Sequence, residues 1–171
     1  MASSLSQNLM IFAVAAAAVI YTAAGASKVY DASKYCQTAD DKKLCEQMVA
    51  GAQNLHDASE KAILATKQYA KKIEGESTAV NSAVKDLPPQ TRKSIVDTCK
   101  ESYKRAVDDL DRSLTALLDN DKGTLMTHLS AALDSDCEDA VNEFGVKFPL
   151  QHDMKRYDAE LDNALAVVTQ Q

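Results

Sequence analysis

The chain has 171 residues, of which 46% are hydrophobic and 26% charged, and its 25 acids outnumber its 19 Lys and Arg residues to give a net charge of -6. This acidic balance argues against a nucleic acid as the partner. The sequence contains only five glycines, three prolines and three phenylalanines, with no tryptophan, which fits a turn-rich or aromatic-rich β fold poorly. We therefore predict an all-α protein.

The N-terminal segment has the form of a secretory signal. Residues 1–26 carry no charged side chain and no histidine, and an apolar run from Leu9 to Ala24 leads into the small residues Ala24-Gly25-Ala26. This pattern predicts a signal peptide over residues 1–26 and a secreted single domain over residues 27–171, with no membrane attachment after cleavage. Because no Lys or Arg precedes the run, an uncleaved membrane anchor is the alternative, although the run is short for a spanning helix of roughly 20 apolar residues.

Two short helices joined by a turn are expected between Val29 and Asn54. Apolar residues at helical spacing stand on both sides of the polar segment Thr38-Ala39-Asp40-Asp41. Cys36 and Cys45 flank this turn, so a disulfide between them would hold the two helices as a hairpin. Such an N-terminal hairpin either packs on its own domain or mediates a homodimer.

Amphipathic helices follow the hairpin. One runs from Asp57 to Ile73, and after Gly75-Glu76-Ser77 a short helix leads up to Pro88-Pro89, which cannot lie inside a helix. The strongest periodic signal comes next, with apolar positions Ile95, Cys99, Tyr103, Val107, Leu110, Leu114 and Leu117. The polar cluster from Asp119 to Gly123 ends this long helix and predicts an antiparallel pairing with the next helix.

Two further apolar stripes complete the chain. The first consists of Leu125, Leu129, Leu133, Cys137, Ala140 and Phe144, and the second of Met154, Tyr157, Leu161, Leu165 and Val168. A break over residues 145–149 separates them. The four longer helices together predict an up-down four-helix bundle, preceded by the N-terminal hairpin.

The four cysteines of an exported chain are normally oxidised to two disulfides, for which three pairings are combinatorially available. Cys99 and Cys137 each lie in the apolar stripe of one of two neighbouring helices, which makes a bridge between them plausible. However, Cys99 lies 22 residues before Asp121 and Cys137 only 16 residues after it, so this bridge requires staggered or inclined helices. Closing the 38-residue span between them would stabilise the fold by roughly 3 to 4 kcal/mol.

The residue patterns point away from an enzyme, a metal site or a cofactor. His56, His128 and His152 lie far apart and outside metal-ligand spacings. The sequence has neither a nucleophile elbow nor a Gly-rich phosphate loop, and paired cysteines would leave no thiol nucleophile. A rival interpretation is an enzyme or lipid carrier that uses a cavity between the helices of the bundle.

The stretch from Asp119 to Glu143 is strongly acidic, with seven acids against one base, Lys122. This acidic stretch is either an ordinary solvated face or a surface that attracts a basic partner. The sequence contains no N-x-[ST] sequon, so N-linked glycans would not shield the helical faces from a protein partner.

Several motifs occur together along the chain. They are Cys36-Gln37-Thr38 with Cys45, then Thr98-Cys99-Lys100-Glu101-Ser102-Tyr103, and then Ala131-Ala132-Leu133-Asp134 with Cys137-Glu138-Asp139 and Phe144. With these motifs the chain resembles the plant invertase and pectin methylesterase inhibitor family over essentially the whole mature length. The resemblance implies a four-helix bundle with an N-terminal hairpin, in which the first two cysteines are bridged to each other and the last two likewise. It also implies a non-catalytic protein of the cell wall, or apoplast, that binds a carbohydrate-active enzyme one-to-one and blocks its substrate cleft without a cofactor.

The two branches of the family differ in their target enzyme. Inhibitors of acid invertase often carry Pro-Lys-Phe between the second and third bundle helices, where this chain has Asn120-Asp121-Lys122-Gly123-Thr124. Inhibitors of pectin methylesterase present polar and acidic residues along the helix that follows the third cysteine, and Glu101 and Asp108 occupy matching positions. The resemblance therefore favours pectin methylesterase as the partner. Acid invertase and a member that inhibits neither enzyme are the alternatives.

The partner-binding residues that we predict are Asp97, Glu101, Arg105 and Asp108. They fall at helical spacing beside the apolar stripe and form one exposed row. Arg105 departs from the acidic pattern of the family, and the spacing allows it to pair with Glu101 or Asp108. The competing interpretation of this row is an ordinary salt-bridged helix face.

Overall fold

The computed structural model describes residues 31–133 and 136–171. The regular elements within these ranges are all helical. In chain order they are the 3-10 helix η1 (Ala32–Tyr35), α1 (Lys42–Met48), α2 (Leu55–Glu76), α3 (Thr78–Ala83), α4 (Pro89–Leu118), α5 (Lys122–Ala131), α6 (Asp136–Asn142) and α7 (Gln151–Val168). The predicted signal peptide over residues 1–26 lies outside the described residues.

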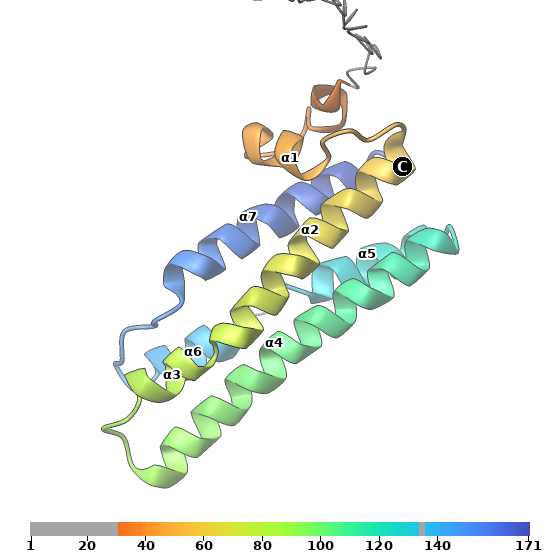
Figure 1. Cartoon of the computed structure of the whole chain (residues 1–171). Coiled ribbons are helices and arrows are strands. Elements are labelled where there is room, and N and C mark those ends of the chain that lie inside the picture. The colour runs from red at the N-terminus through yellow and green to blue at the C-terminus, as the bar shows by residue number, and fades with distance from the viewer. Residues whose placement is uncertain (1–30, 134–135) are drawn as a thin grey trace, which may run out of the picture.

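The long helices α2, α4 and α7, together with the pair α5 and α6, form the four columns of an up-down bundle (Figure 1). Helix α2 packs against both α4 and α7, while α5 and α6 pack along α4. The largest fully buried side chains are aliphatic and include Ile63, Ile73, Leu110, Leu117, Leu129, Leu161 and Val167. The predicted all-α four-helix bundle is confirmed. None of the helices in the described ranges is both long and apolar enough to cross a lipid bilayer.

Local sequence sets where the helices begin and end. The Asn54 side chain accepts a hydrogen bond from the backbone N–H of Asp57 at 2.9 Å, and the Asp57 carboxylate accepts one from the N–H of Gln53 at 2.8 Å. This reciprocal pairing satisfies backbone donors at the start of α2. The end of α2 lies at Glu76, so the helix runs through Gly75, and the predicted interruption is confined to Ser77. A glycine inside a helix costs only about 1 kcal/mol relative to alanine, which the packing of α2 offsets.

The third column of the bundle differs from the continuous stripe predicted over residues 125–144. Helix α5 ends at Ala131 and α6 begins at Asp136, so two short helices replace one long helix. Residues spaced by three or four positions point to the same side only within one uninterrupted helix. Beyond the break, the side chains at these spacings therefore no longer point toward the core. Leu133 and Phe144, which the stripe assigned to the core, are 48% and 46% exposed.

Both disulfides link the cysteines that the sequence favoured. Cys36 is bonded to Cys45 and Cys99 to Cys137, with Cα–Cα distances of 5.8 Å and 4.3 Å. The break between α5 and α6 removes the register problem of the second pair, because α6 packs on α4 independently of the length of α5. All four cysteines of the chain are therefore used, and none is left as a thiol.

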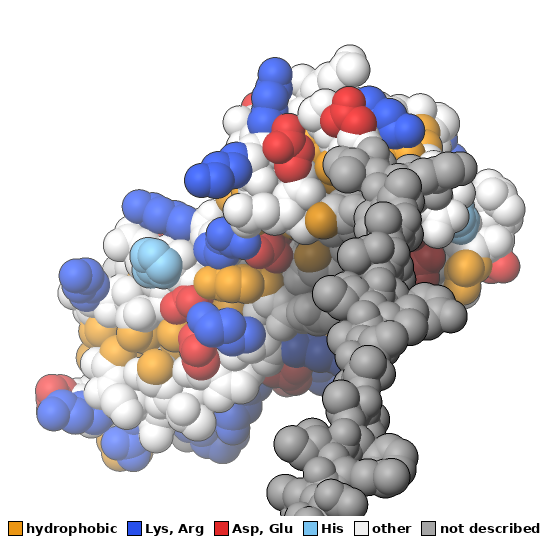
Figure 2. All heavy atoms as spheres, turned by 45° about the horizontal axis from the view of Figure 1, so that its top comes forward, with side chains coloured by type: hydrophobic (Ala, Val, Ile, Leu, Met, Phe, Trp, Pro, Cys, Tyr) orange, Lys and Arg blue, Asp and Glu red, His pale blue; other side chains and the backbone are white. Residues whose placement is uncertain are grey.

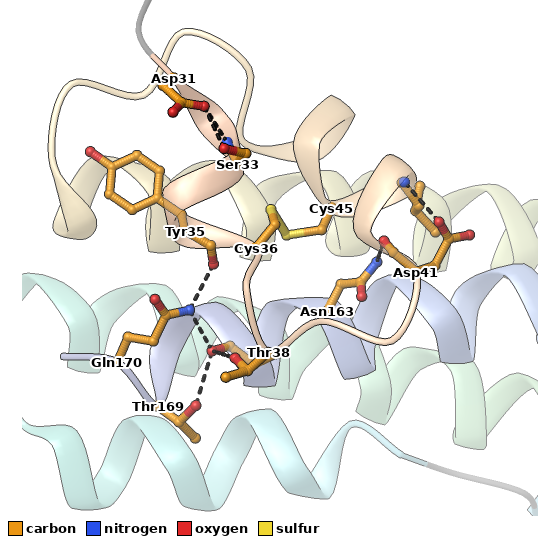
Figure 3. The surroundings of a disulfide bond; sticks show 12 residues. Asp31, Ser33, Tyr35, Cys36, Thr38, Asp41, Cys45, Asn163, Thr169 and Gln170 are labelled. Carbon is orange, nitrogen blue, oxygen red and sulfur yellow. Dashed lines mark hydrogen bonds between the residues drawn. A yellow bond between two sulfur atoms is a disulfide. The ribbon is translucent and has the colours of Figure 1, made fainter.

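The N-terminal hairpin, formed by η1 and α1, packs on its own bundle (Figure 3). Helix α1 contacts α7 and α2. Two side chains from α7 and its C-terminal end bind the hairpin backbone: Asn163 Nδ2 donates to the carbonyl oxygen of Asp41 at 3.0 Å, and Gln170 Nε2 donates to that of Tyr35 at 2.7 Å. Intramolecular packing is thus the arrangement in this structure, and a homodimer through the hairpin stays a prediction.

Candidate partner-binding surface

Helix α4 carries all four of the predicted partner-binding residues. Its buried face includes Cys99, Ala106 and Leu110. An α-helix turns by about 100° per residue, so Asp97, Glu101 and Asp108 project from the side opposite to these buried positions. Glu101 and Asp108 are exposed and Asp97 is half-buried. We call this side the outward face of α4.

Arg105 lies at the edge of the outward face that borders α6. Its guanidinium Nη2 donates to the Asp136 carboxylate of α6 at 2.6 Å. Helical spacing within α4 did not indicate this partner, because the two residues are 31 positions apart in the chain. Both side chains are largely exposed, so the ion pair contributes little to stability. Its role is to connect α4 with α6 near the Cys99–Cys137 disulfide.

The three acids of the outward face differ in their surroundings. Asp97 is paired with Lys93, and the hydrogen bond from Lys93 lowers the pKa of this carboxyl below its usual value, with a smaller effect from the charge of Lys100. Glu101 and Asp108 form no ion pair or hydrogen bond through their carboxylates with other described residues. Within the part of the chain that the structure describes, these two carboxylates therefore have no intramolecular partner.

Basic side chains lie among the acids of α4. They are Arg92, Lys93, Lys100, Lys104, Arg105 and Arg112. Figure 2 shows the same mixture on the side of the molecule that it displays, where Lys and Arg side chains are interspersed with Asp and Glu. A surface of mixed sign generates no strong long-range field. Long-range electrostatic steering of a partner toward the outward face of α4 is therefore not expected from these charges.

Several acids of the acidic stretch have structural partners. The Asp121 carboxylate accepts hydrogen bonds from the backbone N–H of Thr124 at 3.0 Å and from its hydroxyl at 2.6 Å, which caps α5 and lowers the pKa of Asp121. Asp136, Glu138 and Asp139 lie in the first turn of α6, where negative charge is favourable. These four acids therefore stabilise the N-terminal ends of α5 and α6, which gives this part of the acidic stretch a structural role.

The histidines lie apart in the structure as they do in the sequence. His128 Nδ1 on α5 is 2.9 Å from the Asp109 carboxylate on α4, while His56 and His152 are exposed. Within residues 31–133 and 136–171, no group of three or more His, Cys, Asp or Glu side chains is placed to hold a metal ion.

A network of charged and polar side chains joins α2 to α7. No pattern in the local sequence predicted it. The Asp153 carboxylate accepts hydrogen bonds from the Tyr69 hydroxyl at 3.0 Å and from Lys72 Nζ at 2.5 Å. The hydrogen bond from Lys72, followed by that from Tyr69, lowers the pKa of Asp153. One turn further along α7, Arg156 Nε donates to Glu160 at 2.7 Å, and burial raises the pKa of this carboxyl, whose residue is only 4% exposed.

The network at Asp153 predicts an acid-sensitive contribution to stability. Because the folded-state pKa of Asp153 is lowered, its ionised form stabilises the fold above about pH 4, and this stabilisation is lost as the pH falls through the folded-state pKa. We expect Asp153→Asn to lower the free energy of unfolding by about 0.5 to 1 kcal/mol at pH 7. The difference from the wild type should shrink below pH 3 in thermal unfolding monitored by circular dichroism.

Asp162→Asn provides the control, because Asp162 is an exposed aspartate of the same helix that forms no ion pair with other described residues. It should leave the melting temperature nearly unchanged at both pH values. A penalty for Asp153→Asn that is as large at pH 2.5 as at pH 7 would contradict the assigned role of the carboxylate.

The fold defines a class of protein: an up-down helical bundle with two disulfides and an N-terminal hairpin, in which one long helix carries an exposed, charged face. The family model described as plant invertase/pectin methylesterase inhibitor matches residues 31–167, and the chain belongs to this family. The family consists of proteinaceous inhibitors, so the protein is not an enzyme.

The chain is also similar to a solved structure, the crystal structure of a pectin methylesterase inhibitor from Arabidopsis thaliana. The two share 15% sequence identity with a TM-score of 0.54, and the match covers 81% of this chain and 93% of that chain. At this identity the likeness shows the fold alone. No match was found among curated proteins.

Proposed function

We propose that the protein is secreted to the plant cell wall, where it inhibits pectin methylesterase in a one-to-one complex by covering the substrate cleft of the enzyme. Membership of the inhibitor family supports the inhibitory role. The observation that carries the choice of target is the presence of Glu101 and Asp108 on the outward face of α4, both exposed and neither paired with another residue in the described ranges. Acidic and polar residues on this helix are what the resemblance associates with pectin methylesterase.

The mechanism of inhibition is steric. Helix α4 is held to α6 by the Cys99–Cys137 disulfide and packs against α2, α5 and α6. A face that is already ordered loses little conformational entropy on binding, so more of the contact energy appears as affinity. The helix face then excludes the polysaccharide from the cleft without being altered itself. Most of the affinity should come from a few residues near the centre of the interface.

The double variant Glu101→Ala, Asp108→Ala tests the proposal. Each carboxylate that contacts a donor on the enzyme contributes on the order of 1 to 2 kcal/mol, so their joint removal should raise the inhibition constant by about thirtyfold or more. The measurement is the residual activity of a plant pectin methylesterase titrated with oxidised inhibitor between pH 5 and pH 7.

The matched control is the double variant Glu46→Ala, Glu74→Ala, which removes two exposed glutamates from α1 and α2. It should inhibit like the wild type. Normal inhibition by the Glu101 and Asp108 variant across this pH range would show that the binding surface lies elsewhere.

The same titration with a plant acid invertase separates the alternatives. Inhibition of invertase alone would move the binding site to the connection between α4 and α5, residues 119–124, where Asn120 has a left-handed backbone with φ of 56°. Inhibition of neither enzyme by correctly folded protein, tested with several isoforms, would assign the chain to members of the family with another partner.

A further inference from the structure

A pocket of about 500 Å³ lies between α3 and the N-terminal half of α4. This volume falls in the range of roughly 300 to 1,000 Å³ that is typical of small-molecule sites. The α3 side contributes the polar residues Ser77, Thr78 and Asn81. The α4 side contributes three cations, which are Arg92, Lys93 and Lys100. No sequence motif marked this pocket, because its two walls meet only when α3 folds back against α4.

The charge of the pocket is positive, although the chain as a whole is acidic. Its only acidic lining residue is Asp97, which is paired with Lys93. Arg92 Nη1 donates to the backbone carbonyl of Lys85 at 3.4 Å, which engages a donor without neutralising the charge. Lys100 forms no ion pair with another described residue. The lining therefore contains three cations and a single carboxylate, Asp97, which is paired with Lys93 and also interacts with the charge of Lys100.

A second groove, between α1, α2 and α7, does not have such an excess of positive charge. It is also lined by two cations, Lys72 and Arg156. There, however, Lys72 is bonded to Asp153 and Arg156 to Glu160. A groove in which each cation has its own carboxylate offers no excess charge to an anion, whereas the α3–α4 pocket does.

The spacing of the cations indicates the kind of anion. Arg92 and Lys93 are separated from Lys100 by seven to eight residues, which corresponds to about 10 to 12 Å along the helix axis at 1.5 Å per residue. A single phosphate or sulfate is bound by donors that converge on one point, whereas the backbone positions of these cations are spread along one wall of the pocket. They match a ligand with several negative charges distributed along a chain.

The uncharged lining residues narrow the ligand class further. Ser77, Thr78 and Asn81 provide hydroxyl and amide groups that both donate and accept hydrogen bonds, which suits the hydroxyl groups of sugars. Pro89 and Val96 add an apolar surface against which the C–H face of a sugar ring can pack. We propose that the α3–α4 pocket binds an acidic oligosaccharide that carries one carboxylate on each sugar ring. This proposal does not depend on which enzyme the protein inhibits.

Calorimetric titration of the oxidised protein, with no enzyme present, tests the proposal. The ligands are trigalacturonate, its fully methyl-esterified form and inorganic phosphate, each at 50 mM and 200 mM NaCl. We expect trigalacturonate to bind at least tenfold more tightly than the neutral methyl ester and than phosphate, and to weaken at the higher salt concentration. The double variant Arg92→Gln, Lys100→Gln should bind trigalacturonate at least tenfold more weakly than the wild type.

The control variant Lys71→Gln, Lys104→Gln removes the same charge from exposed positions that do not line the pocket. It should bind within about twofold of the wild type, and circular dichroism should show that both variants are folded. An equal loss in the two variants would mean that only the overall charge matters and would overturn the site. Equal binding of the methyl ester, preferential binding of phosphate, or no binding of trigalacturonate would overturn the ligand class.

Discussion

Replacing Cys99 and Cys137 together with serine is expected to lower the free energy of unfolding by about 4 kcal/mol. The bridge spans 38 residues, and in the chain-entropy model the loss grows with the logarithm of the span. A typical domain has only about 5 to 15 kcal/mol of net stability, so this variant should unfold at much lower urea concentrations than the wild type. Urea unfolding followed by circular dichroism at 222 nm measures the difference.

The hairpin disulfide provides the comparison for this prediction. Cys36 and Cys45 are only nine residues apart, so their replacement with serine should cost about 2.5 kcal/mol, less than the loss of the longer bridge. The longer bridge also attaches α6 to α4, so its loss should weaken inhibition as well as stability. A larger loss of stability in the hairpin variant than in the other would contradict the loop-length explanation.

Leu110→Ala is expected to destabilise the protein by about 3 to 5 kcal/mol. Leu110 is 0% exposed in the middle of α4, and truncating such a side chain both removes buried apolar area and leaves a cavity that the tightly packed helices fill only in part. The midpoint of urea unfolding should fall accordingly, with little change in the slope of the transition.

Leu118→Ala is the matched control, because it makes the same chemical change on the same helix at a residue that is 66% exposed. Its effect should stay within about 0.5 kcal/mol. The Leu110 side chain points away from the outward face of α4, so at low temperature, where the variant is still folded, Leu110→Ala should inhibit like the wild type. Loss of inhibition by the folded variant would show that the core position contributes to binding directly.

The sequence alone was sufficient for features that depend on local periodicity. The apolar positions of α4 repeat every three or four residues, so the buried stripe and an exposed row of Asp97, Glu101, Arg105 and Asp108 could both be predicted on the helix. The row was expected beside the stripe, whereas the three acids lie on the opposite side of the helix and Arg105 lies at the edge toward α6. The Cys36–Cys45 disulfide could be favoured because its partners flank one turn. These inferences hold because neighbours along a helix or across a short turn have nearly fixed relative positions, whatever the rest of the fold does.

Only the tertiary structure decided the features that depend on how the helices meet. The break between α5 and α6 lets Cys137 reach Cys99 and turns Leu133 and Phe144 toward solvent. The Arg105–Asp136 pair, the Asp153 network and the pocket between α3 and α4 each join residues from different helices. Their formation depends on the register and inclination of whole helices, which the packing of the core determines and no short stretch of sequence encodes.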